Sequence, residues 1–162
     1  MRGEEEKRTS EHGFEVRSAE AGEAGEIVPL YEWLFAPPGS RPPDWDPRRA
    51  EVALEQAIES RDSVILLAEA GANGPLIGLC SCYQDMHSVR FGYRAWVEDL
   101  AVDPEWRSRG VGKALLDAAR GWGRERGAMH LELDSSMERR DAHRFYEREG
   151  AEYKSISFGW RL

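Results

Sequence analysis

The sequence predicts a mixed α/β (α+β) fold, with a single central sheet of six to seven strands flanked by about four helices. Stretches with strand character and stretches with helical spacing follow one another in a definite order: strand, two helices, three strands, helix, strand, helix, strand. The 162 residues suffice for one compact domain and leave little room for a second. We expect that domain over residues 14–162, preceded by a polar, highly charged and disordered tail over 1–13.

The first part of the domain is predicted to be a strand and two helices. Apolar and polar residues alternate over 14–16, as in a short strand. Apolar residues then fall at helical spacing over 27–34, where Pro29 requires a helix that is kinked or begins late. The segment 36–46 is too rich in proline to be regular. Asp46 followed by Pro47 is a typical helix start, with an N-cap oxygen and a preset φ.

Three strands in succession are predicted next. The run 63–70 is β-branched and aliphatic, and the turn at 71–74 returns the chain as a partner strand over 75–83. A polar loop leads to another strand over 95–102.

The last part of the chain continues the alternation of helix and strand. A helix is expected over 110–126, a strand over 129–134, and a helix over 140–149 that ends at Gly150. A final strand over 153–160 would complete the sheet.

Composition and charge exclude several classes of protein. The net charge of −8 argues against binding the nucleic acid backbone, which requires clustered Lys and Arg. No apolar run approaches the ~20 residues of a membrane span, and the N-terminus is too charged for a secretory signal, so we expect a cytoplasmic protein without membrane association. Cys80 and Cys82 are expected to be buried free thiols rather than a redox pair. The four histidines show no metal-ligand spacing, so no metal site is predicted.

The segment 97–116, VEDLAVDPEWRSRGVGKALL, carries the strongest indication of a ligand. A predicted strand ends, and a turn containing Gly110 and Gly112 opens a helix whose N-terminal N–H groups attract anions. Arg107, Arg109 and Lys113 add positive charge to this turn in an otherwise acidic chain. A diphosphate-bearing ligand would fit there.

Two common phosphate-binding motifs do not match this turn. A P-loop needs Ser or Thr after the Gly-Lys pair, where Ala114 stands, and a first glycine where Arg107 stands. A dinucleotide fingerprint needs a third glycine, and Leu115 occupies that place. A helix that merely begins with glycine and carries surface arginines remains the plain alternative.

Two motifs resemble those of the GNAT superfamily of acetyl-CoA-dependent N-acetyltransferases. The first is Val102-x-Pro104-x-x-Arg107-x-x-Gly110-x-Gly112, which resembles the family's acetyl-CoA signature. The second is the run DAHRFY over 141–146, followed by Gly150, which resembles A-x-x-F-Y-x-x-x-G. Both lie on the expected elements in the expected order, and the resemblance spans 14–162. It implies the GNAT fold and an enzyme that transfers an acetyl group from acetyl-CoA to a primary amine.

The resemblance also assigns residues to the cosubstrate. The pantetheine arm would pair with backbone near Leu100, Ala101 and Val102. Tyr146 would be the general acid that protonates the leaving thiolate; a tyrosine that only packs in the core is the alternative. Many members carry Asn where this chain has Arg139, which departs from the pattern. The diphosphate would rest on the turn, with Arg107 nearby and contacts to the amides of Arg109, Gly110, Val111, Gly112 and Lys113.

Two adjacent carboxylates are candidates for the acceptor side. Attack requires a neutral amine, so a base near the thioester would help. Glu98 and Asp99 lie on the strand beside the expected thioester, and regular alternation would put them on opposite faces. By analogy with diamine acetyltransferases, Glu98 would be the base and Asp99 would anchor the acceptor ammonium; the reverse assignment, or a purely structural role for both, stays open.

The acceptor itself is not specified by the sequence. The segment 131–150 resembles aminoalkylphosphonate acetyltransferases, whereas VEDLAV over 97–102 resembles diamine and polyamine acetyltransferases. We expect a small-molecule amine, with a protein or peptide amine, or a non-catalytic acetyl-CoA sensor, as alternatives. Because dimers are common in the superfamily, a homodimer is an open expectation.

Overall fold

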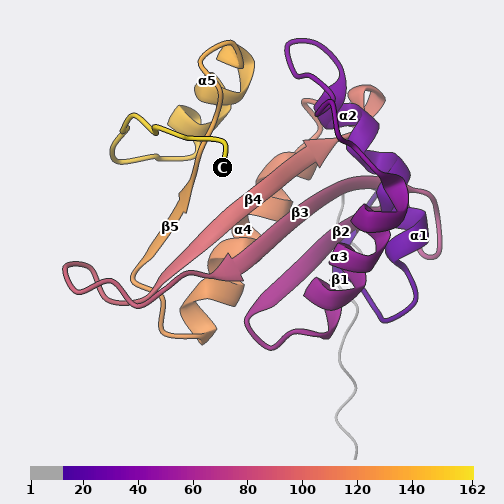
Figure 1. The fold of residues 1–162 in the computed structure, drawn as a ribbon. Helices are drawn as coiled ribbons and strands as arrows, with labels where there is room; N and C mark the ends of the chain where they lie inside the picture. The colour runs from indigo at the N-terminus through magenta and orange to yellow at the C-terminus, as the bar shows by residue number, and fades with distance from the viewer. Residues whose placement is uncertain (1–12) are drawn as a thin grey trace, which may run out of the picture.

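The computed structural model describes residues 13–162, which form one five-stranded mixed sheet with helices on both faces (Figure 1). The first four strands are antiparallel neighbours, and the fifth runs parallel to the fourth. The predicted mixed sheet is confirmed, whereas the predicted six to seven strands are wrong for the described residues. In spatial order the strands are β1 (Glu15–Ser18), β2 (Ser63–Glu69), β3 (Leu76–Gln84), β4 (Arg94–Val102) and β5 (His130–Leu133).

The helices form four segments, as expected. The first is interrupted: α1 (Ala24–Ile27), a 3₁₀ turn (Val28–Tyr31) that contains Pro29, and α2 (Glu32–Phe35) follow without a break, which agrees with a kinked helix, the first of the two alternatives. The start of the second segment is also confirmed, since the Asp46 carboxylate accepts from Arg48 N–H at 2.9 Å. The remaining segments are α3 (Pro47–Glu59), α4 (Val111–Glu125) and α5 (Arg140–Arg148), with a 3₁₀ turn at Pro104–Trp106.

The strand predicted over 153–160 is absent. This segment has no regular structure, and Ile156, Phe158 and Trp160 are 77–81% exposed. The alternation that suggested a strand is real, but no layer of the protein covers its apolar side. Side-chain bonds hold the segment beside β5 instead, from Tyr153 OH to Glu132 at 2.7 Å and from Ser157 Oγ to Asp134 at 2.6 Å.

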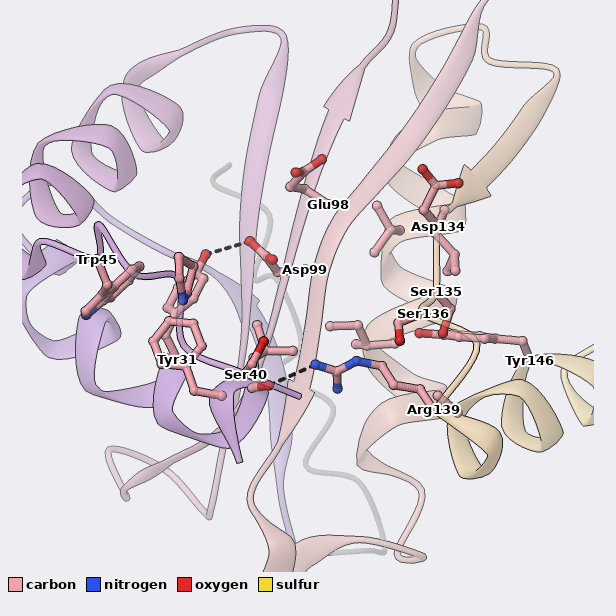
Figure 2. Close-up of a pocket in the computed structure, with 17 residues that line it drawn as sticks. Tyr31, Ser40, Trp45, Glu98, Asp99, Asp134, Ser135, Ser136, Arg139 and Tyr146 are labelled. Carbon is pink, nitrogen blue, oxygen red and sulfur yellow. Dashed lines mark hydrogen bonds between the residues drawn. The ribbon is translucent and has the colours of Figure 1, made fainter. Parts of the chain in front are cut away.

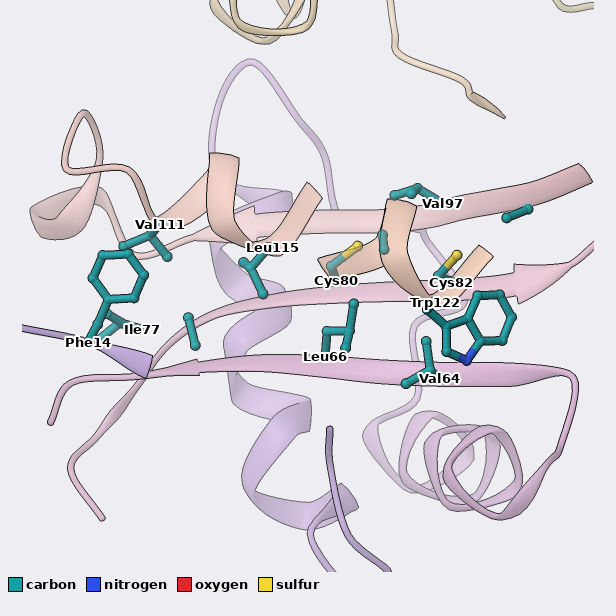
Figure 3. Packing of buried hydrophobic residues seen from close by; sticks show 13 residues of the cluster. Phe14, Val64, Leu66, Ile77, Cys80, Cys82, Val97, Val111, Leu115 and Trp122 are labelled. Carbon is teal, nitrogen blue, oxygen red and sulfur yellow. The ribbon is translucent and has the colours of Figure 1, made fainter. Parts of the chain in front are cut away.

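The core lies on both faces of the sheet. One cluster packs α4 against the sheet and includes Leu66, Leu115 and Trp122 (Figure 3). The other packs the bent N-terminal helix and α3 against the opposite face and includes Ile27 and Leu67. Successive residues of β2 pack alternately into the two clusters, as expected of a strand buried on both sides.

Cys80 and Cys82 belong to the α4 side of the core, and both are free thiols, as predicted (Figure 3). The predicted tail over 1–13 lies outside the described residues except for Gly13, whose carbonyl accepts from Gly71 N–H at 3.1 Å. Within 13–162, no helix is long and apolar enough to cross a membrane.

Two irregularities of β4 create a gap in the sheet. The pairing of β3 with β4 passes from Cys82–Val97 to Ser81–Asp99, so Glu98 is an extra residue in a β-bulge. The pairing of β4 with β5 ends at Val97–Leu133, although β4 continues to Val102. The two parallel strands therefore separate beyond Val97 (Figure 1).

Candidate active site

A cavity of about 350 Å³ opens where β4 and β5 separate (Figure 2). Its walls come from β4, from the segment after β5, from the start of α5, and from α2 with the proline-rich loop. Tyr31, Phe35 and Trp45 supply an aromatic wall, in which the Trp45 ring lies 5.7 Å from Tyr31 and 4.7 Å from Phe35 between centroids. Segments far apart in sequence thus meet around one space.

Glu98 and Asp99 both line this cavity, and the regular alternation on which the prediction of opposite faces rested is interrupted at Glu98. The bulge at Glu98 adds one residue to β4 and reverses the alternation beyond it. Val97 accordingly packs on the α4 side of the sheet, whereas Ala101 packs on the opposite side. Without the bulge, Asp99 would point toward α4.

Asp99 is held in place by two hydroxyl groups. Its Oδ2 accepts from Tyr31 OH at 2.8 Å and from Ser81 Oγ at 3.1 Å, and its backbone N–H donates to Ser81 Oγ at 3.0 Å. Burial and the Asp99 charge raise the pKa of Tyr31, so its hydroxyl stays a proton donor. Both side-chain bonds use Oδ2, which leaves Oδ1 available to a ligand.

Glu98 is surrounded by other negative groups. Partial burial, followed by the charges of Asp99 and Asp134, raises the pKa of Glu98, and Trp96 acts in the opposite direction. Glu98 and Asp134 face each other from the two sides of the gap (Figure 2). A carboxylate with a raised pKa is a stronger base than an ordinary one.

Tyr146 enters the same cavity from α5. Burial raises its pKa to about 12, with a smaller effect of Cys80 in the same direction and an opposing effect of Arg139. The phenol is therefore protonated at neutral pH. Its neighbour Phe145 packs against it with ring centroids 5.3 Å apart.

Arg139 also reaches into the cavity, from the residue before α5. Its Nη2 donates to the Leu34 carbonyl at 2.8 Å, which connects the α5 wall to the end of α2. The sequence indicated Arg139 only as a departure from a motif. Its hydrogen-bond partner, Leu34, lies 105 positions away in the sequence, so no local pattern could indicate the contact.

Several cavity residues had no indication in the sequence. Tyr31 was assigned only to a helix face, and its bond to Asp99 depends on the sheet register across 68 positions. The two residues that follow Asp134 were likewise not placed there. The cavity residues without a functional indication in the sequence are Tyr31, Ser40, Asp134, Ser135 and Ser136.

The glycine turn before α4 has the geometry of an anion site. Gly110 has φ +87°, and Ser108 has φ +60°, so the backbone coils tightly before the helix. The first helical bond runs from Ala114 N–H to the Gly110 carbonyl at 3.0 Å. The N–H groups of residues 111–113 are therefore left unused by the helix. A diphosphate fits this arrangement of donors.

The side chains of the turn differ in what they can offer. Lys113 is already paired with Asp117 at 2.8 Å and Glu149 at 3.3 Å. Arg109 lies over the Trp106 ring at 4.9 Å, and Arg107 adds a second guanidinium. The Val111 side chain is buried in the core, so only its backbone can contact a ligand.

The predicted pantetheine residues continue from the turn to the cavity along β4. Leu100 and Val102 pack against the α4 side of the core, and Ala101 is buried on the other side. All three lie beyond the last β4–β5 pair, so their backbone on that side is not paired with β5. The structure thus brings Glu98, Asp99 and Tyr146 together, and β4 connects them to the separate turn.

A divided parallel strand pair, a bulge beside it and a glycine turn at a helix start together suit a transferase whose cosubstrate carries phosphate groups. Residues 27–151 match the Acetyltransferase (GNAT) family, and the chain belongs to this family. It is an N-acetyltransferase, and acetyl-CoA is its cosubstrate.

Relatives and solved structures agree with this assignment. The chain is 34% identical over 139 residues to the uncharacterized N-acetyltransferase YhfO of Bacillus subtilis, covering 85% of this chain and 89% of YhfO. It is 37% identical over 86 residues to the aminoalkylphosphonate N-acetyltransferase of Salmonella typhimurium, covering 53% of this chain and only 54% of that enzyme. The fold is similar to that of the aminoglycoside N-acetyltransferase AAC(6')-Iy in complex with CoA, with a TM-score of 0.77, 20% identity, and coverage of 92% and 94% of the two chains.

Proposed function

We propose that this chain transfers the acetyl group of acetyl-CoA to a primary amine of a small molecule, by direct attack when both substrates are bound. The observation that carries the proposal is the cavity, which gathers Glu98, Asp99 and Tyr146 beside the unpaired part of β4. Relatives named for aminoalkylphosphonates, aminoglycosides and streptothricin support a small acceptor. A cavity of about 350 Å³ is of a size that suits one.

The cosubstrate would lie along β4. The N–H groups of the turn at 109–113 would bind the diphosphate, with Arg107 and Arg109 adding charge. Backbone groups of Leu100, Ala101 and Val102 would hold the pantetheine arm where β5 has left β4. The bound thioester supplies the electrophilic carbonyl carbon next to the bulge.

Each cavity residue then has a role in the proposed reaction. Asp99, fixed by Tyr31 and Ser81, would bind the ammonium of the acceptor. Glu98 would remove one proton from this ammonium, so that the neutral amine nitrogen bonds to the carbonyl carbon. The carbon–sulfur bond would then break as Tyr146 donates its proton to the sulfur, and the second proton that leaves the nitrogen would restore the Tyr146 hydroxyl. The products are an N-acetylated amine and free CoA thiol.

An acyl-cysteine route is disfavoured by the environment of both thiols. Burial raises the pKa of Cys80 and, to about 12, that of Cys82. Neither thiol ionises appreciably at neutral pH, and a neutral buried thiol is a poor nucleophile. Direct transfer needs no such residue.

A panel of acceptors tests the proposed function. Thiol release from acetyl-CoA would be measured with diamines, aminoglycosides, aminoalkylphosphonates and peptides; we expect release with at least one small amine. Release with peptides alone would favour a protein acceptor, for which the 32% identity over 85 residues to the N-alpha-acetyltransferase 30 of Schizosaccharomyces pombe is a precedent. Acetyl-CoA binding by calorimetry with no release for any acceptor would favour a sensor.

A further inference from the structure

The cavity has ends of opposite charge. Glu98, Asp99 and Asp134 line one end, and the guanidinium of Arg139 lies at the other, beside the proline-rich loop (Figure 2). The three carboxylates suit an ammonium group. An ammonium placed next to Arg139 would instead be repelled, because the two charges have the same sign.

Arg139 has binding capacity that the protein does not use. Among residues 13–162 it takes part in no ion pair, and its hydrogen bond goes to the neutral Leu34 carbonyl. A guanidinium offers several N–H donors in a planar fork, so most of them remain available. None of the three carboxylates at the other end of the cavity pairs with it.

A second group in the cavity lacks a partner. The Ser135 hydroxyl oxygen is buried and has no hydrogen-bond partner in the described structure, although Ser135 lines the cavity. A buried hydroxyl without a partner is costly, and a bound ligand would remove that cost. Ser135 and Arg139 both come from the wall formed by the segment between β5 and α5.

The loop across the cavity is shaped closely around Arg139. A Cβ at Gly39 would lie 2.0 Å from the Leu34 carbonyl oxygen and 2.5 Å from Arg139 Nη2, so only glycine fits beside this hydrogen-bonded pair. The Gly39 N–H donates to the Ala36 carbonyl at 2.9 Å, which tightens the turn. The guanidinium is therefore packed under this loop and hydrogen-bonded to the Leu34 carbonyl.

We propose that Arg139, assisted by Ser135, binds an anionic group of the acceptor, so that the acceptor is a small molecule with a primary amine at one end and a carboxylate, phosphate or phosphonate at the other. This inference rests on the proposed function and narrows its substrate class. The amine would lie near Glu98 and Asp99, and the anion would receive charge-assisted bonds from the guanidinium. Arg139 is thus a residue that determines specificity, and diamines would be poor acceptors.

Matched acceptors and variants test this inference. The acceptors are propylamine, 1,3-diaminopropane, 3-aminopropanoate and 2-aminoethylphosphonate, which differ mainly in the group opposite the amine. For the wild type, we expect kcat/KM with an anionic acceptor to exceed that with propylamine at least ~10-fold. The last two acceptors distinguish a carboxylate from a phosphonate.

The variant Arg139→Gln should lose ~10- to 100-fold in kcat/KM with the anionic acceptors and little with propylamine. Arg140→Gln is the matched control, because Arg140 is exposed, does not line the cavity, and its loss changes the net charge equally. The Arg140→Gln variant should retain the wild-type preference for anionic acceptors over propylamine. The Kd of acetyl-CoA, measured by calorimetry without acceptor, should be the same in both variants and the wild type.

Three results would overturn the inference. One is a wild type that uses propylamine or the diamine as well as the anionic acceptors. Another is an Arg139→Gln variant that loses activity equally with all acceptors and binds acetyl-CoA more weakly, since Arg139 would then serve the cosubstrate. If Arg139→Gln did not fold, Arg139→Met would decide, because methionine keeps most of the length and packing of the side chain without the charge, and an undiminished anion preference would contradict the proposal. If none of the amines tested caused thiol release, the proposed function would fall together with this inference.

Discussion

Replacing Gly110 by alanine should disturb the turn without any steric clash. A Cβ at Gly110 would have no atom within 4 Å, but φ is +87°, a conformation that L-residues with a Cβ adopt at a cost. Gly112, two residues further on, is the matched control. It lies within α4, and a Cβ there would meet Phe145 at 3.5 Å and Val102 at 3.7 Å, which are ordinary contacts.

The difference in free energy follows from this geometry. Gly110→Ala should lower the free energy of unfolding by about 1–2 kcal/mol through backbone strain. Gly112→Ala should leave it unchanged or raise it by up to ~1 kcal/mol, because alanine favours a helix. Gly110→Ala should also raise the Kd of acetyl-CoA by ~10-fold or more for each charge-assisted bond lost from the turn.

Urea denaturation of the two variants and calorimetry with acetyl-CoA provide the measurements. If Gly110→Ala were as stable as the wild type and bound acetyl-CoA equally well, the conformation of the turn would matter neither for stability nor for acetyl-CoA binding. A larger loss of stability in Gly112→Ala than in Gly110→Ala would reverse the expected order and refute the reasoning.

Four further substitutions test the cavity. Tyr146→Phe should lower kcat ~10²-fold at an unchanged Kd for acetyl-CoA, because only the proton donor is removed; an undiminished rate would exclude the acid role. Glu98→Gln should lower kcat to a similar extent. Since a base acts only when ionised, the wild-type kcat/KM should rise with pH through a pKa above the ordinary glutamate value of 4.5, and this limb should vanish in Glu98→Gln. Asp99→Asn should raise the KM of the acceptor more than it lowers kcat, and unchanged kinetics would exclude the anchor. Tyr31→Phe removes the 2.8 Å bond to Asp99 and should cost about 1–3 kcal/mol in urea unfolding; a stability equal to the wild type would show that the bond is dispensable.

The elements defined by local patterns could be predicted from the sequence. The N-cap at Asp46, the interruption at Pro29 and the buried strands β2 to β4 each depend on residues adjacent in the chain, and all are confirmed. The glycine turn that opens α4 was predicted in the same way, because glycines in a turn and a helix start are local patterns, and the φ of +87° at Gly110 is what the structure adds.

The cavity could be predicted only in part, because its geometry depends on register. No residue type marks the bulge at Glu98, yet the bulge alone turns Asp99 toward Tyr31. Similarly, alternation over 153–160 predicts a strand only if another layer covers it, and the sequence does not show whether one does. Arg139 reaches Leu34 through the tertiary fold, which has no counterpart in a local motif.

Hydrogen exchange of the backbone amides over 109–113 tests most directly whether the turn before α4 binds the cosubstrate. Saturating acetyl-CoA should slow exchange at these amides, which α4 leaves largely unused, and leave exchange in α3 unchanged. Binding of acetyl-CoA, verified by calorimetry in the same sample, with unaltered exchange over 109–113 would contradict the account.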